Sequence, residues 1–118
     1  MLSFHKSPRL SVDIFCTVID NYGDIGVCWR LARLLAHEHD CAVRLWVDDL
    51  ASFAKLCPTL DVGATSQIQQ GVEVCWWQHS FAAVLPAEVV IEAFACKLPE
   101  TYVAAMAAMD VPPVWINL

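Results

Sequence analysis

Basic residues are scarce in this sequence. It has seven lysines and arginines against thirteen aspartates and glutamates, so its formal net charge is −6 at pH 7. Contacts with nucleic-acid phosphates or with an anionic membrane surface need a basic patch. The composition therefore argues against nucleic acid and against a membrane as partners, and an acidic surface of this kind suits a basic partner instead.

Three further signals are absent. Charged or polar residues interrupt every apolar run before it reaches membrane-spanning length, and the N-terminal MLSFHKSPRLSVD lacks the apolar stretch and cleavage site of a secretory signal. No C-x-x-C pair occurs among the six cysteines, which are Cys16, Cys28, Cys41, Cys57, Cys75 and Cys96. Such spacing is typical of reduced, buried thiols rather than of a disulfide framework or a zinc site. We therefore expect a cytoplasmic protein without a metal.

What the sequence does contain is a high proportion of apolar residues, 58% of 118. This length suits one domain with a real core, residues 1–118. Strands are predicted at residues 11–19, 41–49, 71–77, 87–95 and 112–118, and helices from residue 24 onward, at 48–58 and at 98–110. Strands that alternate with helices indicate a Rossmann-like α/β fold, a parallel sheet with flanking helices.

The sequence predicts where the five tryptophans lie relative to the core. Trp29, Trp46 and Trp115 are expected inside, whereas Trp76 and Trp77 should face opposite sides of one strand. A parallel strand at residues 112–118 has no helix after it in the sequence, so apolar surface should remain exposed. We interpret the chain as the first part of a larger protein.

The turn after the first strand carries the main functional signal. Asn21–Gly26 reads N-x-G-x-x-G, one substitution away from the dinucleotide fingerprint G-x-G-x-x-G. Asp48, at the end of the second strand, lies near the place of the ribose-binding acid in that motif. Half of a nucleotide-dependent dehydrogenase is therefore one interpretation.

Electrostatics argue against that interpretation. In the fingerprint, backbone N–H groups and the helix N-terminus face a pyrophosphate, but here Asp24 would lie in the anion site and Asp20 at its rim. Two like unit charges about 4 Å apart repel by roughly 1 kcal/mol in water, and by more in a drier cleft. The turn should therefore favour a cation, or a reaction that develops positive charge.

A structural role for the two acids remains an alternative. Asp24 stands at the start of the predicted helix, where a carboxylate can accept bonds from free backbone N–H groups. The pair Asp20-Asn21 is typical of a turn.

Four segments carry a family resemblance: DIFCTVIDNYGDIGVCWRLARLLA, LWVDDL, VVIEAFACKLPE and PVWINL. Together they resemble the N-terminal domain of the protein-arginine rhamnosyltransferases that modify translation elongation factor P, the EarP family, from about Val12 to Leu118. The resemblance implies one half of an inverting GT-B glycosyltransferase, in which two Rossmann-like domains face each other across a cleft. Such enzymes transfer L-rhamnose from dTDP-β-L-rhamnose to one arginine of elongation factor P, and they need no metal or other cofactor for this step.

The resemblance also implies roles for particular residues. The paired acids of the family match Asp20 and Asp24, which would hold the acceptor guanidinium and help it attack the anomeric carbon. We assign the general base to Asp24 and its orientation to Asp20. The implied substrate-binding residues are Asn21, Tyr22, Gly23 and Gly26. The donor-binding domain of the family has no counterpart in these 118 residues, so we expect negligible transferase activity from this chain alone.

Two other interpretations stay open beside the transferase. One is the nucleotide-dependent dehydrogenase half, and the other is a non-catalytic module that docks a basic protein. His37 and His39 do not add a metal site, because residues two apart on a helix point to different faces.

Overall fold

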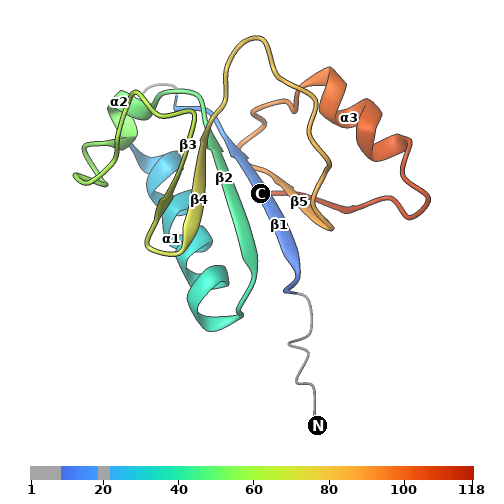
Figure 1. Cartoon of the computed structure of the whole chain (residues 1–118), viewed down its shortest axis with the longest axis horizontal. Coiled ribbons are helices and arrows are strands. Elements are labelled where there is room, and N and C mark those ends of the chain that lie inside the picture. Colours follow the sequence, from blue (N-terminus) through green and yellow to red (C-terminus); the bar gives the residue numbers. More distant parts are fainter. Residues whose placement is uncertain (1–8, 19–21) are drawn as a thin grey trace, which may run out of the picture.

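Six strands form one mostly parallel sheet within residues 9–18 and 22–118, the part of the chain that the computed structural model describes (Figure 1). The strands lie in the order β3-β4-β2-β1-β5-β6. The elements along the chain are β1 (Ser11–Cys16), α1 (Gly23–Glu38), β2 (Ala42–Val47), α2 (Leu50–Phe53), β3 (Ser66–Gln69), β4 (Val72–Trp76), β5 (Val89–Glu92), α3 (Glu100–Ala107) and β6 (Val114–Asn117). The predicted α/β class is confirmed.

The register places β1 in the middle of the sheet. Ile14 of β1 lies beside Leu45 of β2 on one side and beside Ile91 of β5 on the other, all in parallel strands. β2 continues to β4, and β5 continues to β6, again in parallel. The carboxyl ends of the five parallel strands therefore share one edge of the sheet, at the top of Figure 1.

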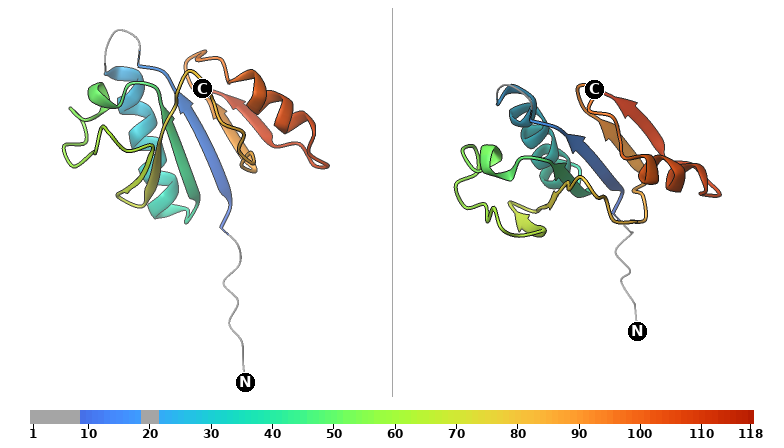
Figure 2. Two further views of the ribbon diagram at one scale, coloured as in Figure 1. Left: turned by 45° about the horizontal axis from the view of Figure 1, so that its top comes forward. Right: turned by 90° about the horizontal axis from the view of Figure 1, so that it is seen from above.

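The two faces of the sheet are covered by different helices (Figure 2). Ile14 and Phe15 are adjacent in β1 and point to opposite faces, as strand geometry requires. On the Ile14 side, α1 packs against β1, β2 and β4 through buried residues that include Cys28 and Trp29. On the Phe15 side, α3 packs through Tyr102. The helices reach these faces because the chain moves in opposite directions from β1 and from β5, and parallel crossovers are right-handed.

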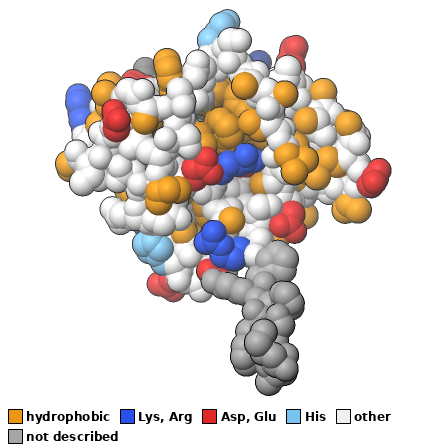
Figure 3. All heavy atoms as spheres, viewed as in Figure 1, with side chains coloured by type: hydrophobic (Ala, Val, Ile, Leu, Met, Phe, Trp, Pro, Cys, Tyr) orange, Lys and Arg blue, Asp and Glu red, His pale blue; other side chains and the backbone are white. Residues whose placement is uncertain are grey.

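Aromatic rings fill the core on the α3 side. Phe15 stacks on Trp46 at 5.6 Å and meets the rings of Trp77 and Tyr102 edge-on. Phe81, from the segment between β4 and β5, packs on Trp46 at 4.9 Å. Hydrophobic side chains gather in the recess between α3 and the β3–β4 side of the molecule (Figure 3). This aromatic core joins the two flanks of the sheet.

One strand was missing from the sequence prediction. β3 pairs with β4 in antiparallel orientation, so the sheet is mixed rather than fully parallel. The turn between them, Gln70 and Gly71, has φ of 49° and 79°. Two successive left-handed residues are typical of a tight hairpin turn. SQIQ, the sequence of β3, has only one large apolar residue, Ile68, which is exposed, and so lacks a strong strand pattern.

Four of the five tryptophans lie where the sequence predicts. Trp29 and Trp46 are buried as expected, and Trp76 is exposed while Trp77 packs on Phe15. The prediction for Trp115 was wrong, because this side chain is 48% exposed. It lies on β6, whose four residues are all exposed, as the uncovered final strand led us to expect.

Candidate functional site

The crevice at the carboxyl edge of the sheet is the expected place for a ligand. The chain leaves β1 toward β2 and β4, and it later returns to the other side of β1 through β5. Open α/β sheets bind ligands at such a switch point, outside the carboxyl ends of the strands. The segment after β1 and the segment after β5 flank this point. A separate hollow of about 370 Å³, lined by Arg9 and Arg44 among others, opens at the amino-terminal edge, where that rule places no ligand.

The segment after β1 contains the residues that the sequence singled out. Asp20 and Asn21 lie outside the described residues. Tyr22 is 40% exposed and directly precedes α1, and Gly23 is the exposed first residue of that helix. Asp24 follows as the second residue of the helix. Of the predicted acid pair, the structure therefore places Asp24.

Asp24 lies in the first turn of α1 and is partly buried. Asp24 is not the N-cap expected from the sequence, because the N-cap residue is Tyr22, whose side chain makes no capping hydrogen bond. Within residues 9–18 and 22–118, no salt bridge joins Asp24 to a lysine or arginine. The helix N-terminus favours a negative charge at this position. Asp24 is thus a carboxylate at a favourable helix position that no lysine or arginine of the described residues neutralises in a salt bridge.

Two contacts hold the ends of the segment that carries the acids. The Asp48 carboxylate accepts a hydrogen bond from the Val18 N–H at 2.8 Å. The Lys55 ammonium donates to the Tyr22 hydroxyl at 2.8 Å and lies 5.4 Å from the centre of that ring. This hydrogen bond raises the pKa of Lys55. Both anchoring side chains come from the segment that follows β2, so this segment positions the turn.

The sequence places Asp48 and Asp49 directly before the next predicted helix, which predicts that both cap it, but the two carboxylates have different roles. Asp49 is the cap: its carboxylate accepts from the Ser52 N–H at 3.0 Å and from the Ser52 hydroxyl at 2.7 Å. These bonds lower the pKa of Asp49. Asp48 instead reaches back to β1. The capping prediction is confirmed for Asp49 and wrong for Asp48.

Gly26 lies one turn into α1, where its N–H donates to the Tyr22 carbonyl at 2.8 Å. A Cβ atom at this position would meet Leu56 Cδ1 at 3.9 Å, an ordinary contact. Packing within the described residues therefore does not require a glycine here. A role in bringing the backbone close to a substrate stays a prediction.

The segment after β5 has a strained backbone. Phe94, Ala95 and Lys97 have φ of 52°, 54° and 58°, although none is a glycine. Each such residue costs of order 1 kcal/mol and persists only where its surroundings hold it. The Phe94 N–H donates to the Leu118 carbonyl at 3.0 Å, and the Cys96 thiol donates to the Phe15 carbonyl at 3.3 Å. Strain of this kind clusters at functional sites, and here it faces the switch point.

The thiols near this edge are not suited to nucleophilic chemistry. Burial raises the pKa of Cys96 to about 12. A hydrogen bond with Cys28, together with burial, also raises the pKa of Cys16. Thiolates are the reactive form of cysteine, so both groups stay protonated at neutral pH. Chemistry at this edge is left to oxygen and nitrogen groups.

Neither a metal-binding cluster nor a membrane-spanning helix is found in the described part of the chain. Among the described residues, no group of three or more His, Cys, Asp or Glu side chains is arranged to hold a metal ion. Within the same ranges, each helix is too short or too polar to cross a bilayer.

The sequence analysis missed the hollow beside the turn. It has a volume of about 470 Å³ and is lined by Thr17, Asp48, Trp76, Trp77 and His79 among others. The sequence does show polar and aromatic side chains at the ends of three predicted strands, and these are the residues that line the hollow. What was missing was the strand order, which brings the ends of β1, β2 and β4 side by side.

The structure is that of an α/β protein with a mostly parallel sheet, whose carboxyl edge carries the carboxylates of Asp24 and Asp48. Residues 12–118 match the model of the family described as "Elongation-Factor P (EF-P) rhamnosyltransferase EarP". The match covers nearly all of the chain, which therefore belongs to the EarP family.

Curated relatives agree with this assignment. A protein-arginine rhamnosyltransferase of Pseudomonas putida is 59% identical over 106 residues, and one of Pseudomonas aeruginosa is 57% identical over 108. The same-named protein of Neisseria meningitidis serogroup B is 44% identical over 116 residues. These matches cover 90%, 92% and 95% of this chain but only 28% to 29% of the relatives. The chain thus spans less than a third of the length of these proteins.

Proposed function

We propose that this chain is the acceptor-binding part of a protein-arginine rhamnosyltransferase. In this proposal the whole enzyme transfers L-rhamnose from dTDP-β-L-rhamnose to an arginine side chain of elongation factor P. Membership of the EarP family and the names of the relatives support the reaction. The acidic carboxyl edge supports the assignment of this part to the cationic acceptor.

The proposal depends on one observation, the position of the Asp24 carboxylate and its lack of a salt bridge to a described lysine or arginine. Its carboxylate lies in the first turn of α1, at the carboxyl edge, with no lysine or arginine of the described residues bridged to it. A structural acid would be expected to cap the helix or to pair with a base, and Asp24 does neither within those residues. A guanidinium is a suitable ligand for such a carboxylate, since it is planar and always charged.

The proposed chemistry uses Asp24 together with Asp20. A protonated guanidinium is a poor nucleophile, so a carboxylate must accept a proton from the attacking nitrogen. That nitrogen then bonds to the anomeric carbon while the bond to the dTDP oxygen breaks, and dTDP leaves with the electron pair. Positive charge develops on the sugar during the transfer, and the acidic edge stabilises it. Asp24 would act as the base, with Asp20 orienting the acceptor.

The remaining substrate contacts follow from the same arrangement. Asn21 and Tyr22 would line the acceptor pocket, and Gly23 and Gly26 would let the backbone approach the substrate. The donor nucleotide would bind to a second Rossmann-like domain of a GT-B enzyme, outside residues 1–118. No metal or other cofactor enters this proposal. We place the reaction in the cytoplasm, where translation factors act, and expect negligible transfer by the 118-residue chain alone.

The test uses a chimaera in which this chain replaces the matching segment of the Pseudomonas putida relative. We expect the Asp24→Asn chimaera to lose about 10²- to 10⁴-fold in kcat, the contribution typical of a positioned base. Transfer is measured as the gain of one deoxyhexosyl mass by elongation factor P. Asp110→Asn, an exposed acid beyond α3, is the matched control and should transfer at the normal rate.

The outcomes separate the alternatives. Normal transfer by Asp24→Asn would show that the base assignment is wrong. Binding of elongation factor P by this chain without any transfer by the unaltered chimaera would favour the docking module. Calorimetric binding of NAD(H) to the 118-residue chain would favour the dehydrogenase half.

A further inference from the structure

The hollow beside the β1–α1 turn has a wall of charge and aromatic rings. Its volume is about 470 Å³, and it is formed where β1, β2 and β4 end. Asp48 is exposed there, and its carboxylate is held at one oxygen by the Val18 N–H. None of the described residues that line the hollow is a lysine or an arginine. Among the described lining residues, His79 is the only titratable base.

The two tryptophans of the hollow are fixed in place. The Trp76 indole N–H donates to the backbone carbonyl of Asp48 at 3.1 Å, so its ring stays beside that residue while remaining 42% exposed. The Trp77 ring packs edge-on against Phe15 at 5.2 Å, and its backbone N–H donates to Val47. Both rings are therefore ordered before a ligand arrives, which reduces the entropy lost on binding.

These features select a cation. An organic cation gains from a carboxylate and from an aromatic face within about 6 Å, whereas a phosphate or carboxylate ligand would be repelled by Asp48. A neutral sugar could stack on a tryptophan, but it would gain nothing from the charge. The formal net charge of −6 for the whole chain also favours the approach of a basic partner.

We propose that this hollow is a second subsite, which takes a basic side chain of the acceptor protein other than the arginine that is modified. The inference rests on the proposed function for its biological setting. The two subsites are adjacent, because Asp48 both lines the hollow and holds Val18 at the start of the acid-bearing turn. An acceptor that presents two basic side chains would then be held on both sides of that turn, which limits its rotation.

The first test uses the 118-residue chain labelled with ¹⁵N and N-acetyl-L-argininamide as the probe. We expect the Trp76 indole N–H signal to shift on titration, whereas the indole of Trp115, exposed on β6, should stay still as an internal control. The neutral citrulline analogue should shift neither signal. Equal shifts of both indoles, or a Trp76 shift with L-rhamnose instead of the argininamide, would overturn the proposal.

The substitution Asp48→Asn isolates the charge. The asparagine side-chain oxygen can still accept from Val18, so the turn keeps its anchor while the negative charge is removed. We expect an affinity about 1.5- to fivefold lower for the argininamide at the Trp76 site, the range for the loss of one exposed ion pair while the aromatic contact remains. Asp110→Asn makes the same change of charge beyond α3 and should leave the affinity unchanged. An equal loss in both variants would show a general charge effect and contradict the subsite.

A kinetic test separates this inference from the proposed function. In the chimaera, Asp48→Asn should raise KM for elongation factor P with little change in kcat, whereas Asp24→Asn should lower kcat. If Asp24→Asn lowers kcat but Asp48→Asn leaves KM unchanged, the second subsite is contradicted and the proposed function is not. If the Trp76 signal shifts in an Asp48-dependent way but Asp24→Asn transfers rhamnose at the normal rate, the proposed function is contradicted and the subsite is not. Trp76→Phe, which keeps a ring, gives a second variant if one of these fails to fold.

Discussion

Asp13 has a carboxylate that is fully buried between the sheet and α3 and accepts hydrogen bonds from four residues. Arg44 donates from two nitrogens at 2.6 Å each, and Trp46 donates at 3.1 Å. The Tyr102 hydroxyl donates at 2.5 Å, and the Ala87 N–H at 3.1 Å. Burial and the hydrogen bond to Asp13 raise the pKa of Tyr102. Burial by itself would lower the pKa of Arg44, but the hydrogen bond and ion pair with Asp13 raise it overall. Asp13 is therefore a structural carboxylate.

Removing the Asp13 charge should destabilise the fold strongly. We expect Asp13→Ala to lower the free energy of unfolding by about 3–5 kcal/mol, because Arg44 and its fellow donors would lose their acceptor in the interior. Urea denaturation monitored by tryptophan fluorescence measures the change. Asp110→Ala, in an exposed turn, should stay within about 0.5 kcal/mol of the unaltered chain. A loss below 1 kcal/mol for Asp13→Ala would show that the network contributes little.

At the scale of elements, short capped segments place the site. α2 has only four residues, yet its cap Asp49 fixes where β2 ends and thereby where Asp48 and Lys55 reach back to β1 and α1. The strained segment after β5 has a similar function on the other side of the switch point. Helices and strands here supply rigidity, while the connecting segments supply the polar groups.

The cap of α2 gives a pH-dependent prediction. The pKa of Asp49 is lower in the folded chain than its ordinary value, because Ser52 hydrogen-bonds the ionised form. The stabilisation is therefore complete above the unfolded pKa of about 3.9 and is lost as the pH falls through the lower folded pKa. Asp49→Ala should cost about 1 kcal/mol of unfolding free energy at pH 7, and the difference should shrink below about pH 4. Urea denaturation of both chains at pH 7 and at pH 3 measures this difference in unfolding free energy. An unchanged difference at pH 3 would contradict the role of the charge.

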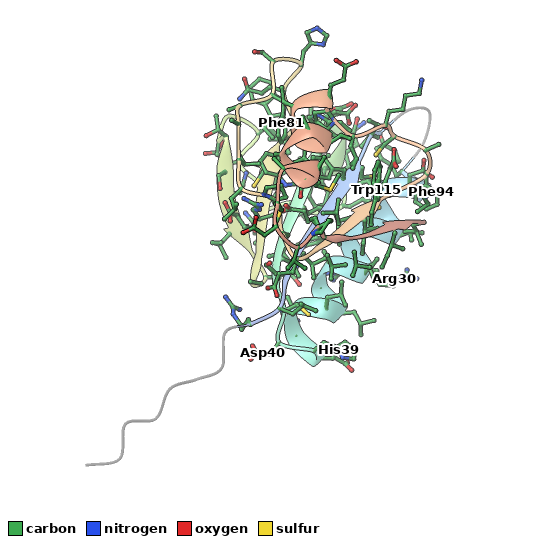
Figure 4. The ribbon with its side chains drawn as sticks, turned by 90° about the vertical axis from the view of Figure 1, so that its right-hand side faces the viewer. Arg30, His39, Asp40, Phe81, Phe94 and Trp115 are labelled. Carbon is green, nitrogen blue, oxygen red and sulfur yellow. The ribbon has the colours of Figure 1, made fainter. Side chains whose placement is uncertain are left out.

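At the scale of the whole molecule, the flank formed by β6 differs from the rest of the sheet. Val114, Trp115 and Ile116 are all exposed, and a small apolar hollow of about 200 Å³ lies between Trp115 and α3. Phe94 and Trp115 lie on this side of the molecule (Figure 4). Edge strands with exposed apolar side chains are prone to pair with other chains.

This flank predicts self-association of the 118-residue chain. We expect sedimentation velocity to show association that increases with concentration, and Ile116→Lys should reduce it by placing a charge on the edge strand. Ile68→Lys on β3, the opposite edge, is the matched control and should have a smaller effect. Both changes lower the net negative charge equally, so weaker repulsion cannot explain a reduction by Ile116→Lys alone. A monomer at every concentration would contradict the prediction.

The agreement between sequence and structure follows the range of the interactions. Apolar strands and the α1 helix were predicted correctly, because their periodicity is written in adjacent residues. Within α1, the helical spacing of Val27 and Leu34 with other apolar residues predicts that both face the core, but they are 45% and 44% exposed. The spacing that identifies a helix does not say how far its covered face extends, and here Ile25, Trp29 and Ala32 lie inward instead.

The α/β class and the family could both be recognised from the sequence alone. These features depend on local residue order, which a single chain displays directly. Three-dimensional contacts were needed to learn that Asp48 holds Val18, that Lys55 holds Tyr22, that Asp13 is buried against Arg44, and that Trp115 is exposed. The reason is physical: such contacts join residues about thirty or more positions apart, and they exist only once strand order and register bring those positions together.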